Sequence, residues 1–376
     1  MSSTATKNPI INRVNGNGSS NGVSSQNIAR DLRRGITAGV LAPGAQLPTR
    51  LELESKYGTT SVTIQRALDR LVRDEFIYVN GRRGTYVSPH PPHLSRYALV
   101  FRHDPDRDHE TWTAFYSALT NQAARLQRRD ERNISTYTAV DGHVDSPNFN
   151  KLLEEIAAER LAGIVFVDGI FGLENSPLVT STHLPKVSIG AVKAENCTAL
   201  LLNEDSFIKR ALEHFEKQNR KRLAIITHRM SNHPFSRALM QAAHKRGFEI
   251  EPFWNQVCFA AQAPAARAQA HLLMKCTSRP NALLITDDNL VEHATAGLVE
   301  AGVLVPQDIE VVGHANFPEP TTAVVAARRL GYDTVEILEA ALASIDARRR
   351  EEKTAASFSM DAVFAEEAKS LHPPAR

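Results

Sequence analysis

Arginine side chains gather in one part of this 376-residue chain, at positions where they could bind phosphate groups. Across residues 61–73, three arginines fall on the side of a predicted helix that faces away from its apolar stripe. Arg82 and Arg83 follow in the next predicted turn. Guanidinium groups on an outer helix face and an adjacent turn are suited to contact the phosphates of DNA.

The elements that must position these arginines are three helices followed by a hairpin. Residues 28–41 and 50–58 show helical patterns, and a turn-rich connector separates them. Asn80 and Gly81 lie between two β-prone runs and predict a hairpin. Helix, helix, helix, hairpin is the order of a winged helix-turn-helix. The apolar positions expected to face its core are Ile28, Leu32, Ile36, Leu51, Leu53, Tyr57, Ile64, Ala67, Leu68, Leu71 and Val72.

The charges are unevenly distributed, although the net charge of the whole chain is only +2. Residues 1–88 carry 12 Lys and Arg against 6 Asp and Glu, whereas residues 89–376 carry 32 against 36. A basic segment before an acidic body indicates that the first segment meets a polyanion. Residues 1–25 are polar and have no apolar core for export, so we expect a disordered tail and a cytoplasmic protein.

Strands and helices alternate along the rest of the chain, after a proline-rich stretch that predicts an extended linker. Short, dense apolar runs such as residues 162–167, 223–227 and 282–286 are typical of buried parallel strands. The pattern predicts an α/β fold, a doubly wound domain of two lobes that binds ligands beyond the carboxyl ends of its strands. The predicted divisions are a tail at 1–25, a DNA-binding domain at 26–88, a linker at 89–96, an effector-binding and dimerisation domain at 97–366 and a tail at 367–376.

The usual signatures of catalysis are absent from the sequence. There is no G-x-S-x-G, Walker A or HExxH motif, so we expect neither an enzyme nor a cofactor. Cys197, Cys258 and Cys276 lie far apart without CxxC spacing, which predicts buried, inert thiols rather than disulfides or a metal site. No apolar run approaches the roughly 20 residues needed to span a bilayer, so no membrane partner is expected.

The first 88 residues show a specific resemblance. GITAGVLAPGAQLPTRLEL, TIQRALDRLVRDEFI and GRRGTYV follow one another in the order and spacing of the DNA-binding domain of the GntR family of bacterial transcription regulators. The resemblance covers residues 26–88. It implies that the third helix enters the major groove of operator DNA and that the wing approaches the minor groove.

The sequence departs from that family where Leu51, Ser61 and Gln65 replace the usual arginines. Glutamine suits adenine, whereas arginine suits guanine. We therefore hypothesise that Gln65 and the hydroxyl groups of Ser61 and Thr63 contact base edges. The other predicted DNA contacts, mainly to phosphates, are Arg50, Arg66, Arg70, Arg82, Arg83 and the wing residue Gly84.

Residues 96–366 are similar to the sugar-sensing core of the LacI family, itself similar to periplasmic sugar-binding proteins. The similarity is clearest in ALLITDDNLVEHATAGLVEAGVLVPQDIEVVG, residues 282–313. This pairing of domains resembles the arabinose-repressor type. It implies that Arg237 and Asp288 bind the effector, through a guanidinium donor and a carboxylate acceptor for sugar hydroxyl groups.

Other candidates border the expected cleft. Trp112 and Phe115 could stack on a sugar face, although each is more often a core residue. Asn203 and Asn316 stand where that family commonly has aspartate, which leaves a sugar acid, a nucleoside or an unliganded pocket open beside a sugar or polyol. The complete effector-binding set is Asp104, Trp112, Phe115, Asp168, Asn203, Arg237, Asp288 and Asn316.

The sequence thus predicts a ligand-responsive transcription regulator, most simply a repressor, that binds operator DNA as a homodimer. Two alternatives stay open at this point. One is a cytosolic sugar-binding protein, and the other is a DNA-binding protein whose effector pocket has degenerated.

Overall fold

The computed structural model describes residues 24–108, 111–129, 132–143, 146–170, 172–192, 194 and 197–371. They form two compact units, which we call the head (residues 24–91) and the body (residues 92–371). Nearly all of the predicted N-terminal tail lies outside the described residues. Its last residue, Ser25, already belongs to a helix.

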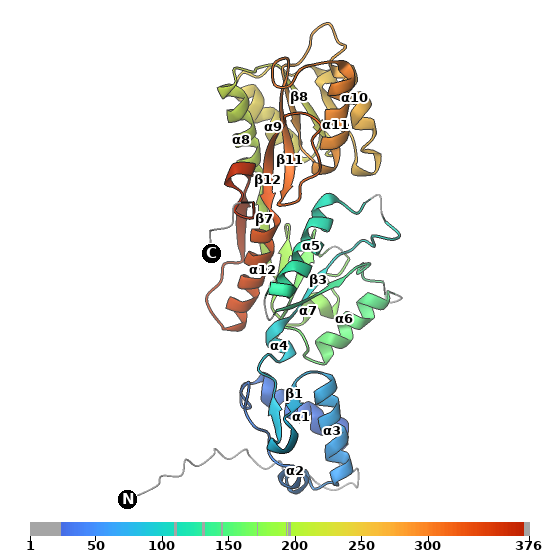
Figure 1. Ribbon diagram of the computed structural model, residues 1–376, viewed down its shortest axis with the longest axis vertical. Helices are drawn as coiled ribbons and strands as arrows, with labels where there is room; N and C mark the ends of the chain where they lie inside the picture. The colour runs from blue at the N-terminus through green and yellow to red at the C-terminus, as the bar shows by residue number, and fades with distance from the viewer. Residues whose placement is uncertain are drawn as a thin grey trace, which may run out of the picture. The chain divides into compact units, whose positions relative to one another are not determined.

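The head has the predicted order of elements (Figure 1). The second helix begins with a capping box: Thr49 Oγ1 accepts from the Glu52 amide, and the Glu52 carboxylate accepts from the Thr49 amide at 2.7 Å. The elements are α1 (Ser25–Thr37), α2 (Arg50–Tyr57), α3 (Ser61–Arg73), β1 (Ile77–Val79) and β2 (Thr85–Val87).

The core of the head forms where α1 and α3 meet the short strands. Most of the predicted stripe is buried, including Leu53 and Ile64, both 0% exposed. Two residues predicted to face the core do not: Leu51 is 77% exposed and Val72 is 40% exposed. Leu51 stands two residues from Leu53, so a helical period places it on the opposite face.

The hairpin is an antiparallel pair in which Ile77 faces Val87 and Val79 faces Thr85. Its loop differs from the predicted tight Asn80–Gly81 turn, because a turn of 3₁₀ helix at Gly81–Arg83 separates the strands. Asn80 N donates to Gly84 O at 2.9 Å and closes the loop. The longer loop carries both arginines of the wing.

The predicted extended linker contains a short helix, α4 (Pro92–Ser95). Proline is tolerated there because the first turn of a helix does not use its amide hydrogens. Arg96, the last predicted linker residue, already belongs to the first strand of the body.

The body contains two six-stranded sheets, which we call the first and second lobes. The first sheet has the order β13-β7-β6-β5-β3-β4 and is parallel throughout. The second has the order β14-β12-β11-β10-β8-β9, parallel except for β14. The predicted α/β fold is confirmed. The strands are β3 (Arg96–Val100), β4 (Asn133–Tyr137), β5 (Gly163–Val167), β6 (Lys186–Ile189), β7 (Cys197–Asn203), β8 (Leu223–Thr227), β9 (Asn255–Val257), β10 (Ala282–Ile285), β11 (Glu310–Phe317), β12 (Arg328–Asp333), β13 (Ser357–Asp361) and β14 (Val363–Phe364).

Helices pack against both sheets (Figure 1). They are α5 (Ala114–Arg129), α6 (Pro147–Ala157), α7 (Pro177–Thr180), α8 (Glu204–Lys217), α9 (Pro234–Lys245), α10 (Ala265–Leu273), α11 (Asp288–Ala301) and α12 (Thr334–Arg349). Short 3₁₀ turns lie at Pro252–Trp254, Ala260–Gln262 and Ala365–Glu367. No helix among the described residues is long and apolar enough to cross a membrane.

The chain crosses between the lobes three times, after Asn203, after Asp333 and after Asp361. The first and third crossings are tied together, because Asn203 Nδ2 donates to Asp361 Oδ1 at 2.6 Å. The second crossing is tied to the first through Tyr332, whose hydroxyl donates to Asn203 O at 3.1 Å. The crossings therefore form one hydrogen-bonded bundle beside the space between the lobes.

Packing continues past the predicted end of the body at residue 366. Ala368 is 1% exposed, and Ser370 N donates to Asp333 Oδ2 at 2.8 Å. Cys197 and Cys258 are buried, as predicted, whereas Cys276 is partly exposed. Burial raises the pKa of the Cys197 thiol to about 12, which keeps it protonated and unreactive.

Candidate functional site

The outer face of α3 is a strip of exposed side chains opposite the buried stripe of the helix. Its members are spaced by four, three and four residues, so they follow one line along the helix. The strip mixes one apolar, one acidic and two basic groups. They are Val62, Arg66, Asp69 and Arg73.

Polar side chains beside this strip are held by neighbours in the head. Gln65 Nε2 donates to Asp69 Oδ1 at 2.6 Å, one helical turn away. Thr63 Oγ1 lies 3.1 Å from Thr60 Oγ1. Ser61 is exposed in the first turn of the helix.

The wing is held in shape by two donors to one carbonyl group. Gln46 Nε2 and the Tyr86 hydroxyl donate to Arg83 O at 3.0 and 3.1 Å. Gly84 has φ +117°, and a Cβ there would lie 2.7 Å from Gln46 Nε2. The turn therefore requires glycine, and it leaves Arg82 and Arg83 exposed.

A cavity of about 760 Å³ lies between the two lobes of the body. Phe115, Tyr116 and Asp168 line it from the first lobe. Its other wall carries His228 and Phe235 of the second lobe. The volume is that of a small-molecule site, and the mixture of aromatic and polar groups is typical of one.

Asp288 lies at the edge of this cavity but is 2% exposed, and its carboxylate is surrounded by donors. Its Oδ2 accepts from the amide and side-chain nitrogens of Asn316, each at 3.1 Å. Its Oδ1 accepts from the amide and hydroxyl of Thr321, at 3.2 and 2.8 Å, and pairs with the Arg329 guanidinium. Five donors occupy the acceptor positions of this carboxylate.

Asp287, the preceding residue, has a different environment. Its Oδ2 lies 2.9 Å from His228 Nδ1, and its Oδ1 accepts from Asn289 N at 2.8 Å and from Asn289 Nδ2 at 2.6 Å. Burial alone would raise the pKa of Asp287, but His228, His314 and Asn289 outweigh it and lower the pKa to about 2. The cavity therefore presents an ionised carboxylate paired with an imidazole.

An ion pair and a partly buried imidazole also line the cavity. Arg229 Nη1 pairs with Glu204 Oε1 at 2.7 Å, and its guanidinium lies over the Phe235 ring at 5.1 Å. Burial lowers the pKa of His314, which favours its neutral form. A neutral imidazole and paired charges suit a ligand rich in hydroxyl groups, which both donates and accepts.

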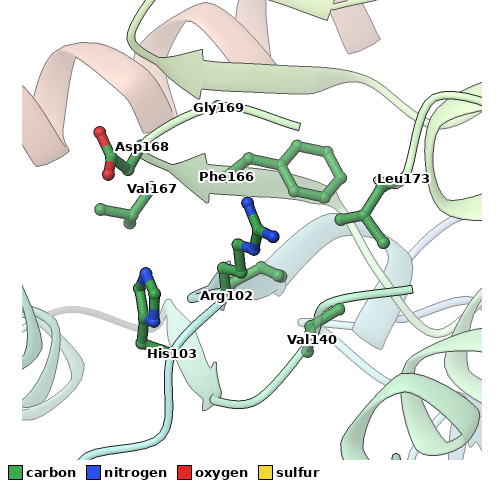
Figure 2. A pocket seen from close by; sticks show the side chains of 9 residues that line it. Arg102, His103, Val140, Phe166, Val167, Asp168, Gly169 and Leu173 are labelled. Carbon is green, nitrogen blue, oxygen red and sulfur yellow. The ribbon is translucent and has the colours of Figure 1, made fainter. Parts of the chain in front are cut away.

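A smaller pocket of about 50 Å³ adjoins the cavity, and Asp168 lines both. Figure 2 shows the Arg102 guanidinium directed into this pocket, with His103 below it. Asp168 Oδ2 accepts from the Tyr116 hydroxyl at 2.9 Å, and burial, followed by Asp168, raises the pKa of Tyr116. The described residues contain no cluster of three or more His, Cys, Asp or Glu side chains that could hold a metal ion.

Comparisons with known proteins assign both units. Residues 24–87 match the gntR family of bacterial regulatory proteins, and residues 212–358 match a periplasmic binding protein-like domain. The chain joins a GntR-family DNA-binding domain to a periplasmic binding protein-like body.

One curated relative matches most of the chain, and another matches only a segment of about 60 residues. The chain is 20% identical over 343 residues to the "Arabinose metabolism transcriptional repressor" of Geobacillus stearothermophilus, covering 82% of this chain and 86% of that protein. The repressor MngR of the mannosyl-D-glycerate transport and metabolism system of Escherichia coli is 38% identical over 60 residues, which are 16% of this chain and 25% of that one. These relatives are named as regulators, not as enzymes.

Solved structures confirm the fold of the periplasmic binding protein-like body. A LacI family transcriptional regulator from Arthrobacter sp. FB24, in complex with lactose, matches with TM-score 0.57 and 12% identity over 72% of this chain and 97% of that chain. A LacI family regulator from Lactobacillus casei with bound sucrose matches with TM-score 0.53 and 15% identity over 72% and 98%. At these identities the likeness shows the fold alone.

The structure gathers five of the eight predicted effector residues around the cavity, namely Phe115, Asp168, Asn203, Asp288 and Asn316. The other three do not line it. Trp112 packs against the Phe101 ring at 5.1 Å and donates to Ser117 Oγ at 3.1 Å. Asp104 Oδ1 accepts from Asp106 N at 3.0 Å within its own loop.

Arg237 is the third predicted residue outside the cavity. It is exposed on α9, and its Nη1 donates to Asn232 O at 2.9 Å. Arg229 supplies the arginine of the cavity instead. Its position offered a signal in the sequence, because it lies two residues after the run 223–227, just beyond the carboxyl end of a strand.

The pairing of Asp287 predicts a specific pH dependence. Because its pKa in the folded protein lies below the usual value, ionised Asp287 stabilises the body above about pH 4, and this contribution is lost as the pH falls toward 2. We expect Asp287→Asn to lower the free energy of unfolding by about 2 kcal/mol at pH 7. Urea unfolding at pH 7 and pH 3 measures this difference, and an equal deficit at both pH values would contradict the prediction.

The acidic residue on the outer strip of α3 predicts a second effect. Asp69 faces outward among arginines and binds the Gln65 amide. We expect Asp69→Asn to strengthen DNA binding about threefold, because it removes a negative charge from the face that carries Arg66 and Arg73 and so lessens the repulsion of phosphates. Fluorescence anisotropy at about 0.1 M salt measures the affinity. Asp106→Asn, the same charge change at an exposed residue of the body, is expected to leave it unchanged.

Proposed function

We propose that this protein is a ligand-responsive transcription repressor whose head binds operator DNA and whose body binds a small polyhydroxylated effector. The observation that carries the proposal is the union of a GntR head with a cavity of about 760 Å³ between the two lobes of the body. A DNA-binding unit joined to a ligand-sized cavity is the minimum that such a regulator requires.

The head supplies contacts of two kinds. The exposed Arg50, Arg66, Arg82 and Arg83 hold phosphates, which position the protein on the duplex without selecting sequence. Residues of the first turns of α3 face the base edges. Gln65 can contact a base only after its side-chain amide releases the Asp69 carboxylate, to which it donates in this structure.

The effector is a sugar or related polyol. Hydroxyl groups can donate to the paired carboxylate of Asp287 and accept from the Arg229 guanidinium, while Phe115 offers an apolar face. Lactose and sucrose are bound by the LacI family proteins of similar fold. In this role Asp288 positions Asn316 and the following loop instead of contacting the effector.

Effector binding acts on the arrangement of the lobes. The three crossings joined at Asn203 form the hinge about which the lobes rotate. A ligand that binds one lobe arrangement more tightly shifts the equilibrium toward it and thereby changes the affinity of the heads for DNA. Two heads in a homodimer occupy two half-sites, whose spacing follows from the dimer.

The test combines two measurements on the full chain. Selection from random DNA gives an operator, whose binding is then titrated at several salt concentrations. A thermal-shift screen of pentoses, hexoses, sugar acids, polyols and nucleosides gives the effector, which is expected to weaken operator binding. Phosphate contacts require a steep fall of affinity with salt. A shallow salt dependence, or an effector without effect on operator affinity, would contradict the proposal.

A further inference from the structure

Val62 is an apolar side chain on the basic outer face of α3. It lies in the first turn of the helix and is 60% exposed. At 100° per residue, Val62 is almost diametrically opposite the buried Ile64, Ala67, Leu68 and Leu71. Its methyl groups therefore point out of the head, on the same strip as Arg66.

The polar side chains next to Val62 on α3 are engaged by hydrogen bonds within the head. Gln65 binds Asp69, and the Thr63 hydroxyl lies against Thr60. Among the side chains of the first turn of α3, Val62 and Ser61 are the exposed ones. The surface that the tip of the helix offers to a groove is therefore largely a pair of methyl groups.

We propose that Val62 determines operator specificity by packing against the 5-methyl group of a thymine in the major groove. The inference rests on the proposed DNA-binding function. Thymine presents a methyl group at the major-groove edge, and apolar side chains recognise it there. Arg66, four residues along the same strip, places a positive charge beside this contact and favours DNA as the occupant over an apolar protein surface.

The test removes the 5-methyl group of thymine from the DNA and, in a separate variant, the two γ-methyl groups of Val62 from the protein. Each thymine of the selected operator is replaced in turn by deoxyuridine, which lacks only that methyl group. Wild-type protein is expected to bind about fourfold more weakly at one position of each half-site, the effect of one buried methyl group. Val62→Ala is expected to show no loss from the same replacement.

Val72→Ala is the matched control. It is the same substitution on the same helix, at a residue that is 40% exposed but lies off the outer strip. This variant should keep the response of the wild type to deoxyuridine, that is, the same fourfold loss at the same position. Circular dichroism of both variants verifies that the head is folded.

The outcomes are distinct. If no thymine position loses its deoxyuridine effect in Val62→Ala, or if Val72→Ala loses it equally, the assignment of Val62 is overturned. If Val62→Ala changes no DNA measurement at all, Val62 does not contact the operator and the assignment is likewise overturned. If the wild type selects no DNA sequence, the proposed function itself fails, and the inference fails with it.

Discussion

Replacing Arg329 with methionine is expected to destabilise the body by about 3–5 kcal/mol, because it leaves the buried carboxylate of Asp288 without its counter-ion. The Asp288 side chain is 1% exposed and that of Arg329 is 12% exposed. Arg329 also donates to Thr321 O and His314 O, each at 2.6 Å. It therefore joins β12 to the loop after β11 and to the wall of the cavity.

Urea unfolding followed by tryptophan fluorescence measures this loss in the body alone. The chain has two tryptophans, Trp112 and Trp254, and both belong to the body. Arg328→Met is the control: its partner is Glu366, their side chains are 42% and 54% exposed, and the expected loss is about 1 kcal/mol or less. Equal losses for the two arginines would contradict the role assigned to the buried pair.

A double variant separates the charge from the packing. Asp288→Asn removes the negative charge that Arg329→Met leaves unpaired, so the two substitutions together should cost less than the sum of their separate effects. Purely additive losses would mean that the pair acts by packing rather than by charge.

The second large effect is expected from Gly297→Ala, which should lower the free energy of unfolding of the body by about 3 kcal/mol. Gly297 lies where α11 crosses α10, and a Cβ there would overlap the carbonyl oxygen of Arg267. The backbone of α10 must then move away. The cost of this movement outweighs the roughly 1 kcal/mol by which alanine favours a helix over glycine. Asp287 and Asn289 lie at the start of α11, so effector affinity should fall as well.

Gly302→Ala provides the comparison for this prediction. Gly302 ends the same helix with φ +72°, and nothing lies within 4 Å of an added Cβ. Only backbone strain opposes the substitution, and we expect the free energy of unfolding to fall by about 1 kcal/mol. The same tryptophan fluorescence applies, because Trp254 packs in the core cluster that contains both helices. A loss at Gly297 no larger than that at Gly302 would contradict the close approach.

The sequence predicted the fold well where burial is continuous. The run 282–286 is apolar because β10 is covered on both faces, so its strand was evident. By contrast β12, with sequence RRLGYD, and β13, with SFSMD, lacked such a run. Arg329 is acceptable in β12 only because Asp288 neutralises it, and that partner stands 41 residues away in the chain.

The same limit applies to the candidate site. Family resemblance selected Asp288 after β10, but the sequence could not show that Asp288 meets Arg329 whereas Asp287 meets His228. Arg237 was predicted from family resemblance, whereas the direction of its side chain depends on how α9 packs. Gln65 was predicted to face DNA, and its bond with Asp69 required knowledge of a rotamer.

The three crossings have a consequence for synthesis on the ribosome. Residues 357–364 supply an edge strand to each of the two sheets, β13 to one and β14 to the other. No nascent chain that stops before residue 357 can complete either lobe, so the two must mature together after most of the body has emerged. The head contains all its own strands by residue 87 and can fold much earlier. A translation product cut short near residue 350 would thus carry a finished DNA-binding unit on a body with two open sheet edges, a form prone to bind operators without regulation and to aggregate.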